Sequence, residues 1–272
     1  RGRIAAERGR HGALPVIDPA TALRIDGRAV LVTGGTRGIG RAIAEACAAA
    51  GADICIVARK PAELEEAEGA ISAMGARVVT VAGSVGDPDV ADAAVRVMIE
   101  TFGRCDVVVN NAAINPVFGP LMDADLGAVT KVFDANISAP LRFARAAWHQ
   151  HMNEHGGVVL NVVSVGGLRA APFIGAYNVS KAALLHLTRQ LAQELAPSVR
   201  VNAIAPGLVK TDMARALWEP NEEAMARTHA LGRLGLPDDI ASGALFLVSD
   251  ASSWMTGELL VVDGGAGVYS RG

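Results

Sequence analysis

Short apolar runs alternate with helical patterns along the chain from residue 28 onward. The runs are almost wholly apolar, as expected for parallel strands that are buried on both faces of a sheet. They span 28–33, 53–58, 77–82, 106–110, 157–163, 199–204 and 258–262. Alternating strands and helices predict an α/β fold, in which a doubly wound parallel sheet of about seven strands carries helices on both faces.

Turn and capping residues mark two of the intervening helices. Pro61 opens one in its first turn and Gly75 closes it. Asp87 and Pro88 supply the N-cap and the first position of the next helix, which is expected to run to about Phe102. Further helices are expected at about 41–50, 125–155 and 175–196.

The chain divides into an N-terminal extension and one domain. Residues 1–25 are rich in arginine and turn-forming residues and lack the apolar stretch of a secretory signal. We expect this extension to be poorly ordered unless a partner subunit holds it. No linker or repeat divides residues 26–272, so a single domain is expected there.

Composition narrows the class of protein. Hydrophobic residues make up 51% of the 272 residues, enough for a sizeable core. The net charge of −3 gives no reason to expect nucleic-acid binding. The sequence contains no run of eighteen apolar residues, so no membrane span is expected. Cys47, Cys55 and Cys105 show no metal spacing and are expected to be small buried hydrophobes in a reducing, cytoplasmic compartment.

A glycine-rich turn joins the first apolar run to the first helical pattern. It reads Gly34-Gly35-Thr36-Arg37-Gly38-Ile39-Gly40. The first backbone N–H groups of a helix have no partner within the helix, and the helix dipole favours negative charge there, so a diphosphate fits the turn. An ordinary glycine-rich turn is the alternative.

A tyrosine and a lysine lie four residues apart at the head of a helical pattern. Tyr177 and Lys181 therefore share one helical face, where an ammonium could lower the pKa of a phenol toward acid–base use. Chance spacing is the alternative. Ser164 ends a strand-like run, at the edge of a parallel sheet where ligands bind. It either binds a substrate carbonyl or simply forms a turn.

Asparagines occur at two positions that suggest a specific role for their side chains. Asn110-Asn111-Ala112-Ala113 closes a strand-like run, and Asn136 lies inside a helical pattern. An asparagine in a helix interior competes with the backbone for hydrogen bonds. Asn136 either marks a kink with a functional side chain or faces solvent.

These features together resemble the short-chain dehydrogenase/reductase family, whose motifs are Thr-Gly-x-x-x-Gly-x-Gly, Asn-Asn-Ala-Gly and Tyr-x-x-x-Lys. The matches are the segments 33–40, 110–113 and 177–181, followed by Arg200-Val201-Asn202, Pro206-Gly207 with Thr211, and 262–265. The resemblance covers about residues 26–268 and implies a Rossmann-type fold. Within the family, the chain is similar to 3-oxoacyl-carrier-protein reductase-like and carbonyl reductase-like members.

The resemblance implies roles for individual residues. Tyr177 would give a proton to the substrate carbonyl, Ser164 would hold the same oxygen, and Lys181 would lower the pKa of Tyr177 and bind ribose. Asn136 would hold a water that joins Lys181 to a proton relay. The implied cofactor-binding residues are Gly34, Thr36, Arg37, Gly38, Ile39, Gly40, Arg59, Ser84, Val85, Asn111, Ala112, Ala113, Tyr177, Lys181, Pro206, Gly207, Val209 and Thr211. The implied substrate-binding residues are Ser164, Gly166, Tyr177 and Trp218.

Charge after the second strand-like run favours NADP(H) over NAD(H). NAD enzymes of this architecture carry an acidic residue there, and Ala58 takes its place. Arg59 and Arg37 can bind a 2′-phosphate, or they are solvated surface charges. Two departures from the family pattern are expected to be tolerated: Ala113 replaces a glycine, and Ser84 replaces an aspartate that contacts adenine.

Two further segments carry weaker signals. The pattern His-x-x-Glu-His at 151–155 is a formal zinc-protease motif, but it precedes two glycines at a helix end, and we expect no metal. Residues 208–231 form either a substrate lid or ordinary core packing. The resemblance also implies a homotetramer.

The expected function is NADPH-dependent reduction of a 3-oxoacyl thioester or ketone. One alternative is an alcohol or hydroxysteroid dehydrogenase that works oxidatively. Another is a non-catalytic NADP-sensing protein on the same fold.

Overall fold

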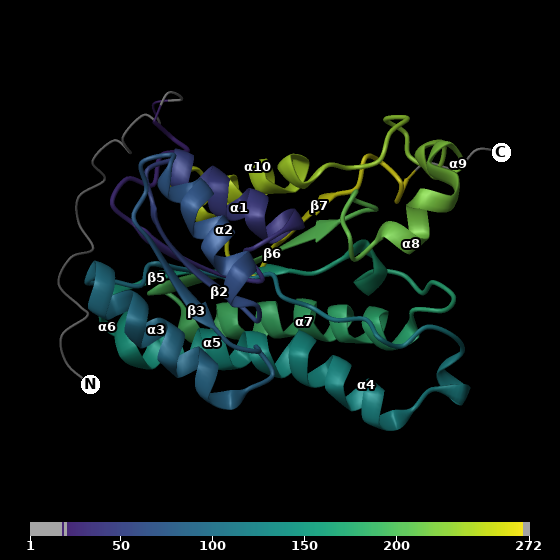
Figure 1. Ribbon diagram of the computed structural model, residues 1–272, viewed down its shortest axis with the longest axis horizontal. Helices are drawn as coiled ribbons and strands as arrows, with labels where there is room; N and C mark the ends of the chain where they lie inside the picture. The colour runs from purple at the N-terminus through teal and green to yellow at the C-terminus, as the bar shows by residue number, and fades with distance from the viewer. Residues whose placement is uncertain (1–17, 19–20, 269–272) are drawn as a thin grey trace, which may run out of the picture.

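Seven parallel strands form one sheet in the order β3-β2-β1-β4-β5-β6-β7 (Figure 1). The computed structural model describes residue 18 and residues 21–268, so most of the expected extension at 1–25 lies outside the described residues. The strands are β1 (Ala29–Thr33), β2 (Asp53–Ala58), β3 (Val78–Ala82), β4 (Val107–Asn110), β5 (Gly157–Val162), β6 (Val199–Pro206) and β7 (Leu259–Val262). The predicted doubly wound sheet is confirmed, and each strand-like run forms a strand within two residues of its expected bounds.

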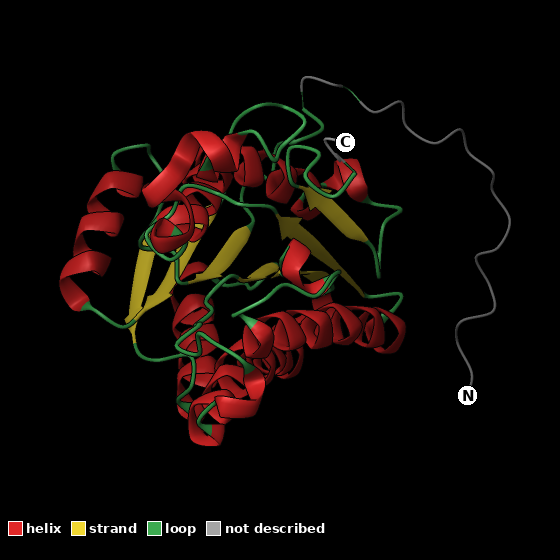
Figure 2. Ribbon diagram, turned by 90° about the vertical axis from the view of Figure 1, so that its right-hand side faces the viewer, coloured by secondary structure: helices red, strands yellow, loops and turns green. Residues whose placement is uncertain are grey.

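Helices cover both faces of the sheet (Figures 1 and 2). Helices α1, α2 and α10 lie on one face, and α3, α4, α5 and α7 lie on the other. Their bounds are α1 (Gly38–Ala49), α2 (Pro61–Ser72), α3 (Pro88–Phe102), α4 (Leu126–Phe133), α5 (Ala139–Ala147), α6 (Asn153–His155), α7 (Gly175–Leu195), α8 (Arg215–Trp218), α9 (Glu222–Ala226) and α10 (Pro237–Val248). Among the described residues, no helix is both long and apolar enough to cross a bilayer.

Alternate residues of each strand enter the two cores. On β1, Val30 and Val32 pack in the cluster that holds residues of α1 and α10. Leu31 packs in the cluster that holds residues of α3 and α5. All three side chains are buried, which explains why the run carries no polar alternation.

The three cysteines are buried, as expected, and burial raises the pKa of each thiol. For Cys47 and Cys55 the value is about 12. Such thiols stay protonated at neutral pH and behave as small hydrophobes.

The long helix expected at 125–155 is interrupted, so that prediction was wrong in detail. Two π-helical turns, η2 (Asp134–Ser138) and η3 (Trp148–Met152), separate α4, α5 and α6. Asn136 lies in η2 with its side chain buried, which favours the kink over the solvent-facing alternative. The Asn136 side chain is held by the Ile114 backbone from another segment, a contact that the helical pattern does not reveal.

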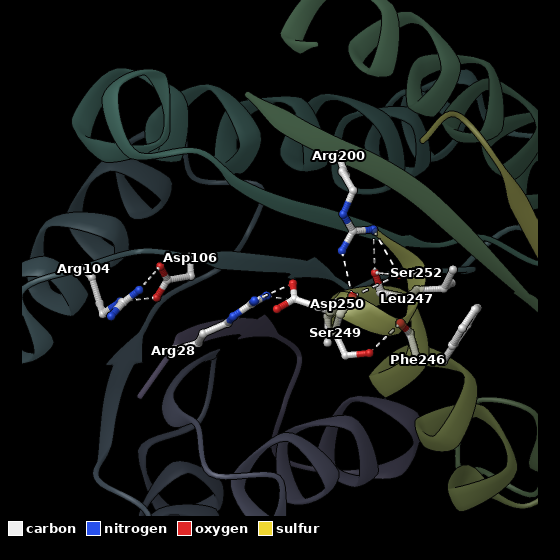
Figure 3. Close-up of polar contacts among 10 residues, drawn as sticks. Arg28, Arg104, Asp106, Arg200, Phe246, Leu247, Ser249, Asp250 and Ser252 are labelled. Atoms are coloured by element: carbon white, nitrogen blue, oxygen red, sulfur yellow. Dashed lines mark hydrogen bonds and ion pairs between the residues drawn. The ribbon is translucent and has the colours of Figure 1, made fainter. Parts of the chain in front are cut away.

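Arginine side chains brace the edge of the sheet at the amino ends of the strands (Figure 3). Arg200, on β6, donates to the carbonyl oxygens of Leu247 at 3.2 Å and Ser249 at 3.0 Å. These carbonyls close α10 and have no partner within the helix. Arg28 forms an ion pair with Asp250 at 2.6 Å. The contacts fix α10 against the sheet and leave the opposite, carboxyl edge free for a site.

Candidate active site

A cavity of about 980 Å³ runs along the carboxyl edge of the sheet. Its walls come from the segments that follow β1 to β6, together with α7 and the residues around α8 and α9. The strand order reverses between β1 and β4, and ligands of doubly wound sheets bind at such a switch point. Every residue named above as cofactor-binding lines this cavity.

The glycine turn has the shape that a bound diphosphate requires. Gly34 and Gly38 have positive φ values of 66° and 54°. A Cβ on Gly40 would lie 2.3 Å from the Gly34 carbonyl oxygen and 2.3 Å from the Asn111 Nδ2. Arg37 makes no side-chain cap to α1, so the first N–H groups of that helix face the cavity side of the turn without a cap. The turn therefore fits the diphosphate of a dinucleotide.

A polar clamp joins the ends of β1 and β4 beneath this turn. The Thr33 hydroxyl accepts from the Asn111 and Ala112 backbone N–H groups at 3.0 and 3.1 Å. The Asn111 side chain donates to the Thr33 and Gly34 carbonyl oxygens at 2.9 and 3.1 Å. Asn111 thus holds the backbone at the start of the glycine turn through hydrogen bonds. This role requires β1 and β4 to be neighbours in the sheet.

Ser164, Tyr177 and Lys181 come together in the cavity. Ser164 follows β5 and shares a side-chain hydrogen bond with Tyr177 on α7. The Lys181 Nζ lies 5.6 Å from the centre of the Tyr177 ring and donates to the Val162 carbonyl oxygen at 2.8 Å. Ser164 also accepts from the Gly166 N–H at 3.1 Å, so the turn and the site uses of this serine coexist.

Burial sets the electrostatics of this group. It lowers the pKa of Lys181 from its ordinary value of 10.5 to about 7. Burial also raises the pKa of Tyr177, and the hydrogen bond with Ser164 opposes that rise. The expected lowering of the Tyr177 pKa is therefore not what the structure gives. Enclosure disfavours the charged form of both groups, and the ammonium is directed to the Val162 carbonyl oxygen.

Asn136 does not line the cavity but supports one of its walls. Its Oδ1 accepts from the Ile114 N–H at 2.9 Å, and its Nδ2 donates to the Ile114 carbonyl oxygen and to the Ser180 Oγ, each at 3.0 Å. Ser180 in turn donates to the Tyr177 carbonyl oxygen at 2.7 Å. The side chain ties the segment after β4 to the first turns of α7, where Tyr177 lies.

Charged residues surround the end of the cavity next to β2. Arg59 lines it and is exposed, while Arg37 lies 3.9 Å from Asp212. Sequence reasoning missed Glu63 here, whose carboxylate pairs with Lys60 at 2.7 Å. The hydrogen bond from Lys60 lowers the pKa of Glu63. Glu63 gave no sequence signal, because its place depends on how α2 lies against the glycine turn.

Apolar side chains surround the other end. Gly166 lines the cavity as expected, but Trp218 does not; its indole N–H donates to the Thr211 carbonyl oxygen at 3.4 Å. The neighbouring Leu217 lines the cavity instead. Sequence reasoning also missed Asn115 and Arg169, which line this cavity without belonging to any motif.

The His-x-x-Glu-His segment lies at the end of a helix. His155 Nδ1 lies 3.0 Å from the His151 carbonyl oxygen, and the two rings stack with centres 4.2 Å apart. Within residues 21–268 and residue 18, no group of three acidic, histidine or cysteine residues is placed to hold a metal ion.

Comparison with known proteins gives consistent matches over nearly the whole chain. The family model described as enoyl-(acyl carrier protein) reductase matches residues 34–267. Human dehydrogenase/reductase SDR family member 4 is 39% identical over 241 residues, which cover 88% of this chain and 87% of that protein.

Two solved structures are similar in fold and sequence. A 7α-hydroxysteroid dehydrogenase complexed with NADH and 7-oxo glycochenodeoxycholic acid has a TM-score of 0.87 and 30% identity, covering 92% of this chain and 98% of its own. A short-chain dehydrogenase from Burkholderia cenocepacia in complex with NADP has a TM-score of 0.82 and 33% identity, covering 90% of this chain and 100% of its own.

Proposed function

The chain belongs to the short-chain dehydrogenase/reductase family, and on that premise we propose that it is an NADP(H)-dependent reductase of small-molecule carbonyl compounds. The observation that carries the proposal is the meeting of Ser164, Tyr177 and Lys181 in one cavity with the glycine turn. The glycine turn follows β1, Ser164 follows β5, and Tyr177 and Lys181 share α7, so three separate parts of the chain meet here. A non-catalytic NADP sensor would need the turn but not a hydroxyl pair beside it.

Each of the three side chains has a chemical task in this proposal. When the cofactor is bound, its nicotinamide supplies the hydride. Tyr177 gives its phenolic proton to the carbonyl oxygen, and a raised pKa keeps that proton on the phenol until it is needed. Ser164 donates a hydrogen bond to the same oxygen as charge develops on it. Lys181 holds the ribose hydroxyls.

Preference for NADP(H) is supported by the charges next to β2. Ala58 leaves no carboxylate to accept a ribose 2′-hydroxyl, and Arg59 and Arg37 both line the cavity at this end. Glu63 is the opposing charge, and its pairing with Lys60 offsets it. The short-chain dehydrogenase from Burkholderia cenocepacia binds NADP, whereas the hydroxysteroid dehydrogenase binds NADH.

The substrate end suits a ketone or a 3-oxoacyl thioester. Leu208, Met213, Leu217 and Met225 come from residues 208–231 and line the cavity, so this segment would act as the lid. An oxidative alcohol or hydroxysteroid dehydrogenase would use the same residues in reverse, and the hydroxysteroid dehydrogenase is one such relative by name. A homotetramer is proposed from the family resemblance, and light scattering of the purified protein tests it.

A substrate panel tests the proposal. The purified protein is mixed with NADPH and with ketones, acetoacetyl thioesters and quinones, and the nicotinamide absorbance is followed. We expect oxidation of NADPH that depends on the carbonyl compound. Reduction of NADP⁺ by alcohols without any reductase activity would favour the oxidative alternative, and no reaction in either direction would contradict the enzyme assignment.

A further inference from the structure

Among the described residues, one arginine lies at the substrate end of the cavity. Arg169 lines the cavity wall five residues after Ser164. Its Nη1 donates to the Ala266 carbonyl oxygen at 3.3 Å. Among the described residues, no carboxylate lies within ion-pair distance of its guanidinium. A second partner is therefore open to it.

Lys181 is buried beside Tyr177, and the other cations of the cavity belong to the cofactor end. Arg37 faces Asp212, and Lys60 pairs with Glu63 beside β2, where Arg59 also lies. Lys131 lies on α4, one turn before Asp134. Arg142 donates hydrogen bonds to the Asp134 carboxylate and, at 3.0 Å, to the Val85 carbonyl oxygen. Lys131 and Asp134 therefore lie beside the turn after β3. Arg169 alone follows β5 together with Ser164.

The segment that carries Arg169 is held against α7. A Cβ on Gly167 would lie 2.8 Å from the Lys181 carbonyl carbon, so the turn Val165–Gly167 packs directly on that helix. The Asn178 Nδ2 contacts the Ala171 carbonyl oxygen at 3.5 Å on the far side of Arg169. The arginine is thus attached at both flanks to the helix that carries Tyr177.

Apolar side chains share the cavity with this arginine. Val165, Ile174, Met213 and Leu217 line the same cavity. An arginine that contacts only water does not require apolar residues in the same cavity. An apolar wall with one cation at its margin is the arrangement that orients a ligand with an apolar body and an anionic end.

We propose that Arg169 binds a carboxylate of the substrate, so that the enzyme acts on apolar carbonyl compounds that carry a carboxylate away from the reacting carbonyl. The inference rests on the proposed function, because it assigns the other end of the same substrate. A guanidinium binds a carboxylate through two parallel hydrogen bonds. One guanidinium balances one carboxylate, whereas a phosphate monoester carries up to two negative charges at neutral pH. The carboxylate is therefore the better match.

A matched pair of substrates tests the proposal. Benzoylalkanoic acids of increasing chain length are compared with their methyl esters, which keep the apolar body and the ketone but lack the charge. For the best chain length, we expect the wild-type protein to have a kcat/KM about tenfold higher for the acid. Arg169→Gln should remove this preference by raising KM for the acid about tenfold, a much larger effect than on the ester.

Two further variants serve as controls for the role of the Arg169 charge. Arg169→Lys should keep part of the preference, because it keeps the charge but loses the two-point geometry. Arg96→Gln, which removes an exposed arginine from α3 outside the cavity, should behave as wild type. An acid-to-ester ratio that is the same in wild type and Arg169→Gln would overturn the proposal. Equal loss for acid and ester would assign Arg169 to loop structure and also overturn it.

Binding measurements separate failure of this proposal from failure of the proposed function. The wild-type protein and Arg169→Gln, each saturated with NADP⁺, are titrated calorimetrically with the keto acid, its ester and a matching keto phosphonate. Tighter binding of the acid that depends on Arg169, without any turnover, would support the carboxylate site and contradict the reductase. Turnover with no preference for the acid would do the reverse. Tighter binding of the phosphonate than of the acid would contradict the choice of carboxylate.

Discussion

Lys181 shows how strongly position changes a single side chain. Its ammonium is enclosed between β5 and α7, and burial lowers its pKa from 10.5 to about 7. The folded protein therefore binds fewer protons than the unfolded chain between these two values. Stability should rise with pH over that interval, because the charged form is the one that burial disfavours.

Substitution of this lysine tests the linkage. Lys181→Met removes the titrating group, so the Tm of wild type relative to that of Lys181→Met should increase between about pH 7 and about pH 9. The comparison stops there because the buried thiols, whose pKa values are raised, contribute stability that falls at higher pH. A difference in Tm that stays constant across this interval would show that the lysine is not held in the way described.

Arg59 carries the predicted choice of cofactor. Arg59→Ala should raise the KM for NADPH by about 10- to 100-fold, because a charge-assisted contact with the 2′-phosphate is lost. The KM for NADH should change little, since that cofactor lacks the phosphate. Steady-state kinetics with both cofactors measure this, with Arg96→Ala as the control. An equal effect on both would refute the assignment.

At the scale of elements, the start of α1 requires a residue without a side chain at position 40. Gly40→Ala would place a Cβ against the Gly34 carbonyl oxygen and the Asn111 amide at distances no packing tolerates. The turn must then shift, and we expect NADPH binding to weaken by more than tenfold. Fluorescence titration with NADPH measures the loss.

A second glycine in a helix gives the matched control. Gly69 lies in α2, and a Cβ there meets nothing within 4 Å. Gly69→Ala should keep NADPH affinity and stabilise the protein by about 0.5–1 kcal/mol through helix propensity. Wild-type affinity in Gly40→Ala would contradict the close fit of the turn.

Elements with a clear apolar pattern were predictable from the sequence. Elements whose shape depends on contacts with other segments were not. A buried parallel strand needs an unbroken apolar run, so β1 to β7 could be placed within two residues. The interruption at Asn136 could not, because the asparagine is held by the Ile114 backbone, which lies in another segment. Asparagine in the helix was the only hint.

At the scale of the whole molecule, the site is a product of strand order. The glycine turn and Ser164 could be placed together because the carboxyl ends of parallel strands meet at one edge, and the family resemblance placed Tyr177 beside them. Arg169 and Glu63 were not, since each lies in a segment whose position is set by packing against α7 or the glycine turn. Which of Leu217 and Trp218 faces the cavity likewise depends on how the short helix α8 is oriented.

Tyr177→Phe tests the central claim most directly, because it removes one oxygen and leaves the ring beside Lys181 in place. If the phenol is the proton donor, this variant binds NADPH with wild-type affinity while kcat for carbonyl reduction falls by about 10²- to 10⁴-fold. NADPH titration and steady-state kinetics on the same preparation give both values. Carbonyl reduction within a few-fold of wild type, with the cofactor bound, would contradict the account.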